Sequence, residues 1–210
     1  MKNLSESDRR DLLAIARWAI EAAVCRGQSA GGPASPISRA MTEPAAAFVT
    51  IHEFGRLRGC IGLMRFEVPL WQNVRDAASA AALDDPRFLP VSESELPAIE
   101  LEVSVLDPPV ELADPSGFVA GRHGIVVERG ARRALLLPQV ATEMGWDETK
   151  MLEAVCQKAN LPTDAWRDES TRLLVFESMC FSEAEAADPA RGPAGPAPGP
   201  DSPGAARAGV

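Results

Sequence analysis

Residues 99–106 (IELEVSVL) alternate apolar and polar side chains without a break, and this is the strongest structural pattern in the chain. A period of two predicts a β-strand whose successive side chains point to opposite faces of a sheet. The polar positions are Glu100, Glu102 and Ser104. Such a strand is typical of an antiparallel sheet with one face packed on a core and the other exposed or lining a cleft.

Two further strands are predicted at residues 46–52 and 57–63, where apolar runs flank a polar turn that contains Gly55. The turn is assigned to residues 53–56. If it is four residues long, Val49 lies opposite Cys60 across the resulting hairpin.

Helices are predicted on both sides of this hairpin. The first starts with a capping box at Ser5 and Asp8, carries apolar residues at helical spacing and ends at Gly27. The second covers residues 69–83 and has one apolar stripe. Residues 27–44 are rich in glycine and proline and predict a long surface loop.

The second half of the chain predicts a further unit of short elements. They are strands at residues 125–128 and 134–137 joined through 129–133, a helical turn at 140–144, a helix at 149–159 and a last strand at 173–181. Trp166 is expected to anchor the loop before the last strand. Because strands are joined by hairpins and loops and do not alternate regularly with helices, the sequence predicts an α+β fold with antiparallel sheets.

Charge and composition exclude several classes of function. The chain of 210 residues has a formal charge of −9, which disfavours nucleic acid and acidic lipid surfaces as partners. No apolar run approaches the roughly 20 residues that span a bilayer, so no membrane segment is expected. The four cysteines are widely spaced, as expected of free thiols in a reducing cytoplasm. With two histidines and no compact run of oxygen ligands, no metal and no cofactor is assigned.

Composition also divides the chain near its end. Residues 1–183 have the balance of a folded domain, whereas residues 184–210 are almost entirely alanine, proline, glycine, aspartate, serine and arginine. Such a segment buries too little apolar surface to offset its ordering entropy, so a disordered tail is predicted. The alternative interpretation is a tether for a partner.

Cys60 is the most informative residue for chemistry because glycines flank it inside a predicted strand. Gly59 and Gly62 weaken a strand unless another chain or a ligand approaches its backbone closely. Arg56 and Arg58 precede the cysteine, and a nearby cation would lower the pKa of its thiol. The pattern therefore indicates a nucleophilic or ligand-contacting thiol, or alternatively a small buried cysteine in a bulged strand.

Two further positions are candidates for acid–base chemistry. His123 lies between Gly121 and Gly124, where an imidazole can act as a base for a thiol or simply occupy a turn. Glu100 and Glu102 share a strand face, where paired carboxylates can shift a pKa or simply form a polar surface. Cys156 and Cys180 occupy apolar positions and are predicted to lie in the core, whereas Cys25 ends the first helix.

The segment FVTIHEFGRLRGCIG, residues 48–62, is similar to the signature of the AMMECR family, in which a strand enters the string LRGCIG. Further motifs follow in the family's order: AALDDPRFLPVSESELP, IELEVSVLDPP, GRHGIVVERG, LLLPQVATEMGW, CQKANLP and CFSE. Asn160 departs from the family pattern, in which glycine is more usual at that position.

The resemblance implies a two-lobed α+β fold with a cleft between the lobes. It implies that Cys60 is the functional centre, with His123 and Glu102 as further catalytic candidates. The positions matched to family motifs and assigned to substrate binding are Arg58, Gly59, Ile61, Gly62, Asp85, Arg87, Ser104, Gly124 and Gln139. Phe88 and Pro138 also match the motifs.

In bacteria and archaea, proteins of this kind resemble component A of the AmmeMemoRadiSam set. Its other members are a Memo-like protein and a radical S-adenosylmethionine protein, so these two are the implied partners. One hypothesis is an enzyme component in which Cys60 is the nucleophile or covalent carrier. The alternative is a non-catalytic binding or adaptor module that presents the LRGCIG segment to a partner protein.

Overall fold

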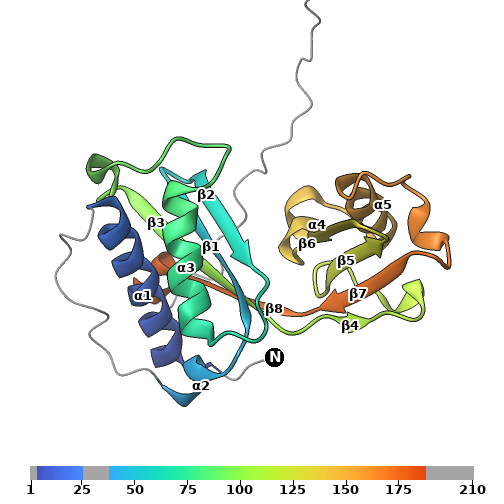
Figure 1. The fold of residues 1–210 in the computed structure, drawn as a ribbon, viewed down its shortest axis with the longest axis horizontal. Helices are drawn as coiled ribbons and strands as arrows, with labels where there is room; N and C mark the ends of the chain where they lie inside the picture. Colours follow the sequence, from blue (N-terminus) through green and yellow to red (C-terminus); the bar gives the residue numbers. More distant parts are fainter. Residues whose placement is uncertain (1–3, 26–37, 188–210) are drawn as a thin grey trace, which may run out of the picture.

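The computed structural model describes residues 4–25 and 38–187, which form two four-stranded antiparallel sheets with helices packed against them (Figure 1). The strand orders are β2-β1-β3-β8 in the first sheet and β4-β7-β5-β6 in the second. This architecture confirms the predicted α+β class. Residues 1–3, 26–37 and 188–210 lie outside the described residues, and with them Gly27, most of the predicted loop at 27–44 and most of the predicted tail.

The first lobe is built on the strand with the strict alternation. Its strands are β1 (Ala46–Glu53), β2 (Arg56–Leu63), β3 (Ile99–Leu106) and β8 (Ser178–Ser182), and its main helices are α1 (Glu6–Val24) and α3 (Leu70–Leu83). The two helices lie side by side on one face of the sheet (Figure 1). The Ser5–Asp8 capping box starts α1 as predicted, and the apolar stripe of α3 is buried.

The register of the β1–β2 hairpin differs by one residue from the prediction. The turn contains only Phe54 and Gly55, which leaves His52 opposite Leu57 as predicted, but a bulge beyond this pair makes Arg58 an extra residue of β2. As a result Thr50, and not Val49, lies opposite Cys60. A bulge changes which residues pair without changing the hydrophobic pattern, so the sequence did not reveal it.

The second lobe contains the predicted short elements, with small changes of boundary. It comprises β4 (Val110–Glu111), β5 (Gly124–Arg129), β6 (Arg132–Leu136), β7 (Arg172–Phe176), α4 (Gln139–Met144) and α5 (Glu148–Lys158). Trp166 is half-buried and packs against the core of this lobe. Asn160 follows α5 with φ +58°, a left-handed conformation that glycine and asparagine adopt most readily.

Short helices lie where none was predicted. The turn α2 (Arg39–Thr42) falls in the predicted surface loop, and α6 (Glu183–Ala187) continues the chain past the predicted domain end. The remaining helical turns are of the 3₁₀ type, at Glu93–Glu95, Pro115–Gly117 and Ala165–Arg167.

The predicted single strand at residues 173–181 is wrong, because it is divided between the two sheets. β7 belongs to the second sheet and β8 to the first, and Glu177 is the residue between them. The chain crosses in the opposite direction from β3 to β4, and the Asp107 N–H donates to the Glu177 carbonyl at 3.0 Å. A two-stranded ribbon therefore connects the lobes (Figure 1).

A small apolar cluster packs where the lobes meet. Ala46 and Leu106 come from the first sheet, and Val126 and Phe176 from the second, and all four are buried. Met64 and Phe66, on the segment after β2, pack against this cluster. The two sheets are thus held together by side-chain packing as well as by the connecting ribbon.

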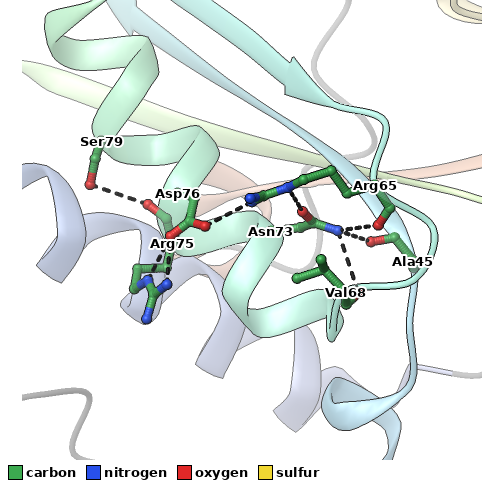
Figure 2. Close-up of polar contacts among 7 residues, drawn as sticks. All are labelled: Ala45, Arg65, Val68, Asn73, Arg75, Asp76 and Ser79. Atoms are coloured by element: carbon green, nitrogen blue, oxygen red, sulfur yellow. Dashed lines mark hydrogen bonds and ion pairs between the residues drawn. The ribbon is translucent and has the colours of Figure 1, made fainter.

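A buried asparagine holds that segment in place. The Asn73 side-chain amide donates to the carbonyls of Ala45 and Arg65, each at 2.7 Å, and its oxygen accepts from the Arg65 guanidinium at 2.9 Å (Figure 2). Buried carbonyls need such partners because an unsatisfied polar group is costly in the interior. Asn73 therefore fixes the start of β1 and the segment after β2 to helix α3.

Candidate functional site

The first sheet has two chemically different faces. Residues directly opposite each other in antiparallel strands point to the same face, and Thr50 lies opposite both Cys60 on β2 and Glu102 on β3. Ser104 shares this face because it is two residues from Glu102, and Cys180 lies opposite Ser104 on β8. We call the face defined by Thr50, Cys60, Glu102, Ser104 and Cys180 the polar face. Helices α1 and α3 cover the opposite face.

The Cys60 thiol is half-buried on the polar face, and the Thr50 hydroxyl donates to its sulfur at 3.3 Å. Burial raises the pKa of this thiol, and the Thr50 hydrogen bond and the Arg87 charge oppose that shift only in part. Cys60 is therefore mainly protonated at neutral pH. The expectation that neighbouring arginines would lower this pKa is wrong, because loss of hydration outweighs them.

The backbone of Cys60 is held from outside the sheet. β2 is an edge strand, so half of its peptide groups have no strand partner. Asp85 accepts the Cys60 N–H at 2.9 Å, and the Arg87 guanidinium donates to the Cys60 carbonyl at 3.3 Å. Arg87 and Asp85 also form an ion pair at 2.7 Å. Both exposed peptide groups of the cysteine are thereby satisfied, which fixes its position along the edge.

Asp85 is 5% exposed, so its charge requires compensation. The Arg87 hydrogen bonds are the largest cause that lowers the pKa of Asp85 to about 2, with a further contribution from the Cys60 N–H. Asp85 is thus ionised at neutral pH and accepts hydrogen bonds with both carboxylate oxygens. We name the contact of Asp85 and Arg87 with the Cys60 peptide the Cys60 clamp.

Arg58 does not lie over the thiol. Its guanidinium donates to Glu95 at 2.7 Å and to the carbonyls of Leu89 and Pro90 at 2.9 and 3.3 Å. This hydrogen bonding holds the pKa of Glu95 near 2. Arg58 therefore attaches the loop that follows the clamp to strand β2, and the cation that acts on Cys60 is Arg87.

Packing within the chain leaves no room for a side chain at the two glycines beside Cys60. A Cβ on Gly59 would lie 2.3 Å from the Ala81 carbonyl oxygen of α3, and one on Gly62 would lie 2.1 Å from the Phe48 ring. Ile61, between them in the strand, packs against the core under α1 and α3. The close approach predicted at this segment is thus made by a helix backbone and an aromatic ring.

The second lobe contributes two side chains to the surroundings of the polar face. The Gln139 amide at the start of α4 donates to the Ser104 hydroxyl at 3.5 Å. Glu143 lies one helical turn further along α4 and is half-buried. Burial raises the pKa of Glu143, and the Glu102 carboxylate adds to the shift. Carboxylates from two lobes therefore influence each other at this face.

Cys180 is exposed, so its predicted core position is wrong. The apolar residues of β8 are Met179 and Phe181, which pack under the helices, and alternation then places Cys180 on the polar face. Cys156 is buried in the core of the second lobe, as predicted.

The structure does not bring His123 to Cys60. Its ring Nδ1 accepts the Val119 N–H at 3.2 Å, and the backbone N–H of His123 donates to the Val119 carbonyl at 2.9 Å. Gly124, the next residue, begins β5 and packs under the Phe176 ring. Among the hydrogen bonds of residues 4–25 and 38–187, none joins His123 to the polar face.

Sequence reasoning missed Thr50 and Glu143 as neighbours of the site. Thr50 could have been found by counting pairs from a two-residue turn with a bulge, but no local signal marks the bulge. Glu143 had no signal, because its position depends on how the second lobe meets the first. Within the described ranges, no group of three or more histidine, cysteine, aspartate or glutamate residues could hold a metal ion.

These observations define a class: a two-lobed α+β protein with a positioned cysteine on the polar face of its first sheet. Comparison with known proteins is consistent with this description. The AMMECR1 family model matches residues 13–181, and the chain belongs to that family.

Relatives cover nearly the same length of chain. A protein of Methanothermobacter thermautotrophicus is 42% identical over 186 residues, which is 86% of this chain and 96% of that protein. A protein of Aquifex aeolicus is 34% identical over 185 residues, 85% of this chain and 94% of that protein.

A solved structure shares the fold. The crystal structure of an uncharacterized protein from Pyrococcus horikoshii superimposes with a TM-score of 0.76 and 38% sequence identity. The match covers 82% of this chain and 89% of that one. As for membranes, no helix in the described part of this chain has the length and apolar character needed to cross one.

Proposed function

We propose that this chain is the AMMECR1-family component of a modification system of the AmmeMemoRadiSam type, located in the cytoplasm, in which Cys60 handles the substrate. The observation that carries the proposal is the Cys60 clamp. Asp85 and Arg87 hold both peptide groups of one residue, while the side chain of that residue points to a face of polar groups. Backbone positioning of this kind holds a reactive group in one geometry.

The chemistry that fits the site uses a protonated thiol. Because burial raises the pKa of Cys60, the resting group is S–H, which can donate a hydrogen bond or a proton to a bound molecule. The Thr50 hydroxyl, which donates to the sulfur, supports the thiolate after the proton has left. Glu102 lies across Thr50 on the same face. It is the candidate to accept a proton that the bound molecule or a water molecule passes on.

The test is product formation by the reconstituted system. The chain is combined with a Memo-like protein and a radical S-adenosylmethionine protein, and modification of the target is followed by mass spectrometry. Cys60→Ser is expected to lower the rate by at least about 100-fold, the usual contribution of a group that transfers a proton or forms a bond. Cys180→Ser on the same face is the matched control and should retain the rate. Full activity of Cys60→Ser in a folded chain would rule the proposal out.

A second candidate function, that of an adaptor, is favoured by the tip of the β1–β2 hairpin. Phe54 is 84% exposed and has φ +50°, which is unusual for a bulky residue. Phe54 and Arg58 line a surface hollow, and Arg58 holds the carbonyl of Leu89, whose side chain is 83% exposed. Exposed apolar residues around a hollow are typical of a contact surface for another protein.

The two functions are separated by one further variant. Phe54→Asn removes the exposed ring and keeps a residue suited to positive φ, so the hairpin should remain folded. On the adaptor hypothesis this variant loses binding to the partner proteins in copurification, while Cys60→Ser binds them normally. On the thiol hypothesis Cys60→Ser is the more impaired variant in the product assay and Phe54→Asn is the less impaired one.

A further inference from the structure

Strand β2 departs from regular pairing at Arg58, two residues before the cysteine. Strand β1 pairs His52 with Leu57 and then Ile51 with Gly59. Arg58 lies between these pairs as the extra residue of the bulge. In an unbroken strand, alternation would place its side chain on the face of the cysteine. A bulge re-aims the side chain that it inserts, so Arg58 is free to point elsewhere.

The Arg58 guanidinium is engaged with the loop that runs beside β2. Its three nitrogens donate to the Glu95 carboxylate at 2.7 Å and to the carbonyls of Leu89 and Pro90 at 2.9 and 3.3 Å. The side chains of Arg58 and Glu95 are only 15% and 23% exposed. A planar guanidinium fork can reach three acceptors at once, which a single ammonium cannot. This use of all three nitrogens favours attachment of the loop over contact with a substrate.

The loop that Arg58 holds is the loop that carries the Cys60 clamp. It begins where α3 ends, and its far end is fixed by the Val91 N–H, which donates to the Ala82 carbonyl at 2.8 Å. The clamp lies in the first half of this loop, and the two carbonyls bound by Arg58 belong to the residues just before Val91. Arg58 and the clamp therefore fasten one short loop to one strand edge.

We infer that Arg58 is a positioning residue for Cys60, which acts through the Cys60 clamp and does not touch the substrate. This inference rests on the proposed function, because the position of Cys60 matters for a reaction only if that residue handles the substrate. Arg58 fixes the second half of the loop, and this limits how far Asp85 and Arg87 can withdraw from the Cys60 peptide. A reacting group held in one geometry reacts faster than one that wanders.

The experiment measures hydrogen–deuterium exchange of the Cys60 backbone amide by NMR in the full chain. Asp85 accepts this N–H at 2.9 Å, so the amide exchanges only when the clamp opens. The amide of Val103, a buried residue in the middle of the same sheet, reports on opening of the sheet as a whole. The exchange rates of the two amides are compared in the native chain and in each variant.

Arg58→Ala is expected to speed exchange at Cys60 at least about tenfold and to leave Val103 unchanged, because the clamp opens more often while the sheet stays closed. Arg58→Lys keeps the charge but loses the fork, so it should behave like Arg58→Ala. The control Arg172→Ala removes the same charge from an exposed position of the second lobe and should change neither amide.

Two further measurements show whether Arg58 acts through the clamp. Asp85→Ala removes the acceptor of the Cys60 N–H, so adding Arg58→Ala to it should not speed the exchange further. In the product assay, Arg58→Ala should lower kcat and leave KM unchanged, as expected of a residue that orients the reacting group without binding the substrate.

Each of four results would overturn the inference. They are unchanged Cys60 exchange in Arg58→Ala, equal acceleration at Val103, native behaviour of Arg58→Lys, and an Arg58→Ala effect that persists in the Asp85→Ala background. Unchanged Cys60 exchange in Arg58→Ala, together with loss of activity in Cys60→Ser, would refute the inference alone. Faster Cys60 exchange with an unchanged product rate would refute the proposed function and leave the attachment of the clamp by Arg58 intact.

Discussion

The two faces of the first sheet are made by the same strands, yet they have opposite chemistry. On the face under α1 and α3, strand β3 presents Leu101, Val103 and Val105, and all three are buried. On the polar face the same strand presents Glu102 and Ser104 beside the thiols. Position in the alternation, and not closeness in sequence, therefore separates residues that stabilise the fold from residues available for chemistry.

The largest expected effect comes from neighbouring residues of β3 on opposite faces. Leu101→Ala leaves a cavity under the helices and should lower the free energy of unfolding by about 3 kcal/mol. Glu102→Gln changes a half-buried polar side chain and should alter it by less than about 1 kcal/mol. Urea unfolding of both variants measures the difference. Equal losses would show that the two faces do not differ as described.

The glycines beside Cys60 test the same contrast on β2. Gly59→Ala puts a methyl group 2.3 Å from a helix carbonyl, which cannot turn away, so we expect a loss of about 2–3 kcal/mol. Gly62→Ala meets the Phe48 ring on the other face, and a ring can rotate, so we expect a loss of about 1–2 kcal/mol. Thermal unfolding ranks the two variants. A larger loss for Gly62→Ala than for Gly59→Ala would contradict the assignment of the rigid contact to the face under the helices.

Asp85 gives a pH dependence to the clamp at the sheet edge. The folded-state pKa of Asp85 is about 2, below the ordinary value of 3.8. Its contribution to the free energy of unfolding is therefore complete above pH 4 and is lost as the pH falls towards 2. The shift corresponds to about 2 kcal/mol at neutral pH.

The variant Asp85→Asn should therefore be less stable than the native chain by about 2 kcal/mol at pH 7, and this gap should close near pH 2. Unfolding by urea at several pH values provides the measurement. Glu95→Gln is the companion variant, because Glu95 also has a lowered pKa but binds Arg58 and not the Cys60 peptide. A gap for Asp85→Asn that does not vary with pH would contradict the assigned charge.

The smallest expected effect is at the hairpin tip, which belongs to neither face. Phe54 and Gly55 both have positive φ, at +50° and +73°, as a type I′ turn requires. Asparagine adopts this conformation at lower cost than phenylalanine, so Phe54→Asn should stabilise the chain by up to about 1 kcal/mol. A small rise in Tm is the expected reading. A fall would mean that the ring packs against the fold and is not available to a partner.

Much of the fold could be predicted because its signals are local. The alternation of residues 99–106, the capping box at Ser5 and the stripe on α3 each follow from periodicity within one element. The errors lie where contacts between distant parts of the chain decide how the strands pair. The bulge beside Cys60 changed the pairing, and the crossing at Glu177 divided one predicted strand between two sheets.

The candidate site was predictable in its centre but not in its surroundings. The glycine-flanked motif singled out Cys60, and the resemblance singled out Asp85 and Arg87, which form the clamp. The direction of the Cys60 pKa shift was mispredicted, because hydration of a thiol depends on all the atoms packed round it. Glu143 and Cys180 reach the polar face through the lobe arrangement and strand parity, which no motif encodes.

The central claim is that the Cys60 thiol, unlike that of Cys156, can be reached by another molecule while the chain is folded. The direct measurement is labelling of both cysteines in the same molecule by neutral iodoacetamide, with quantification by peptide mass spectrometry. Cys60 should label in the native state, at a rate that keeps rising with pH past the ordinary thiol pKa of 9.0, whereas Cys156 should label only when denaturant unfolds the chain. Labelling of Cys60 no faster than that of Cys156 would contradict the account.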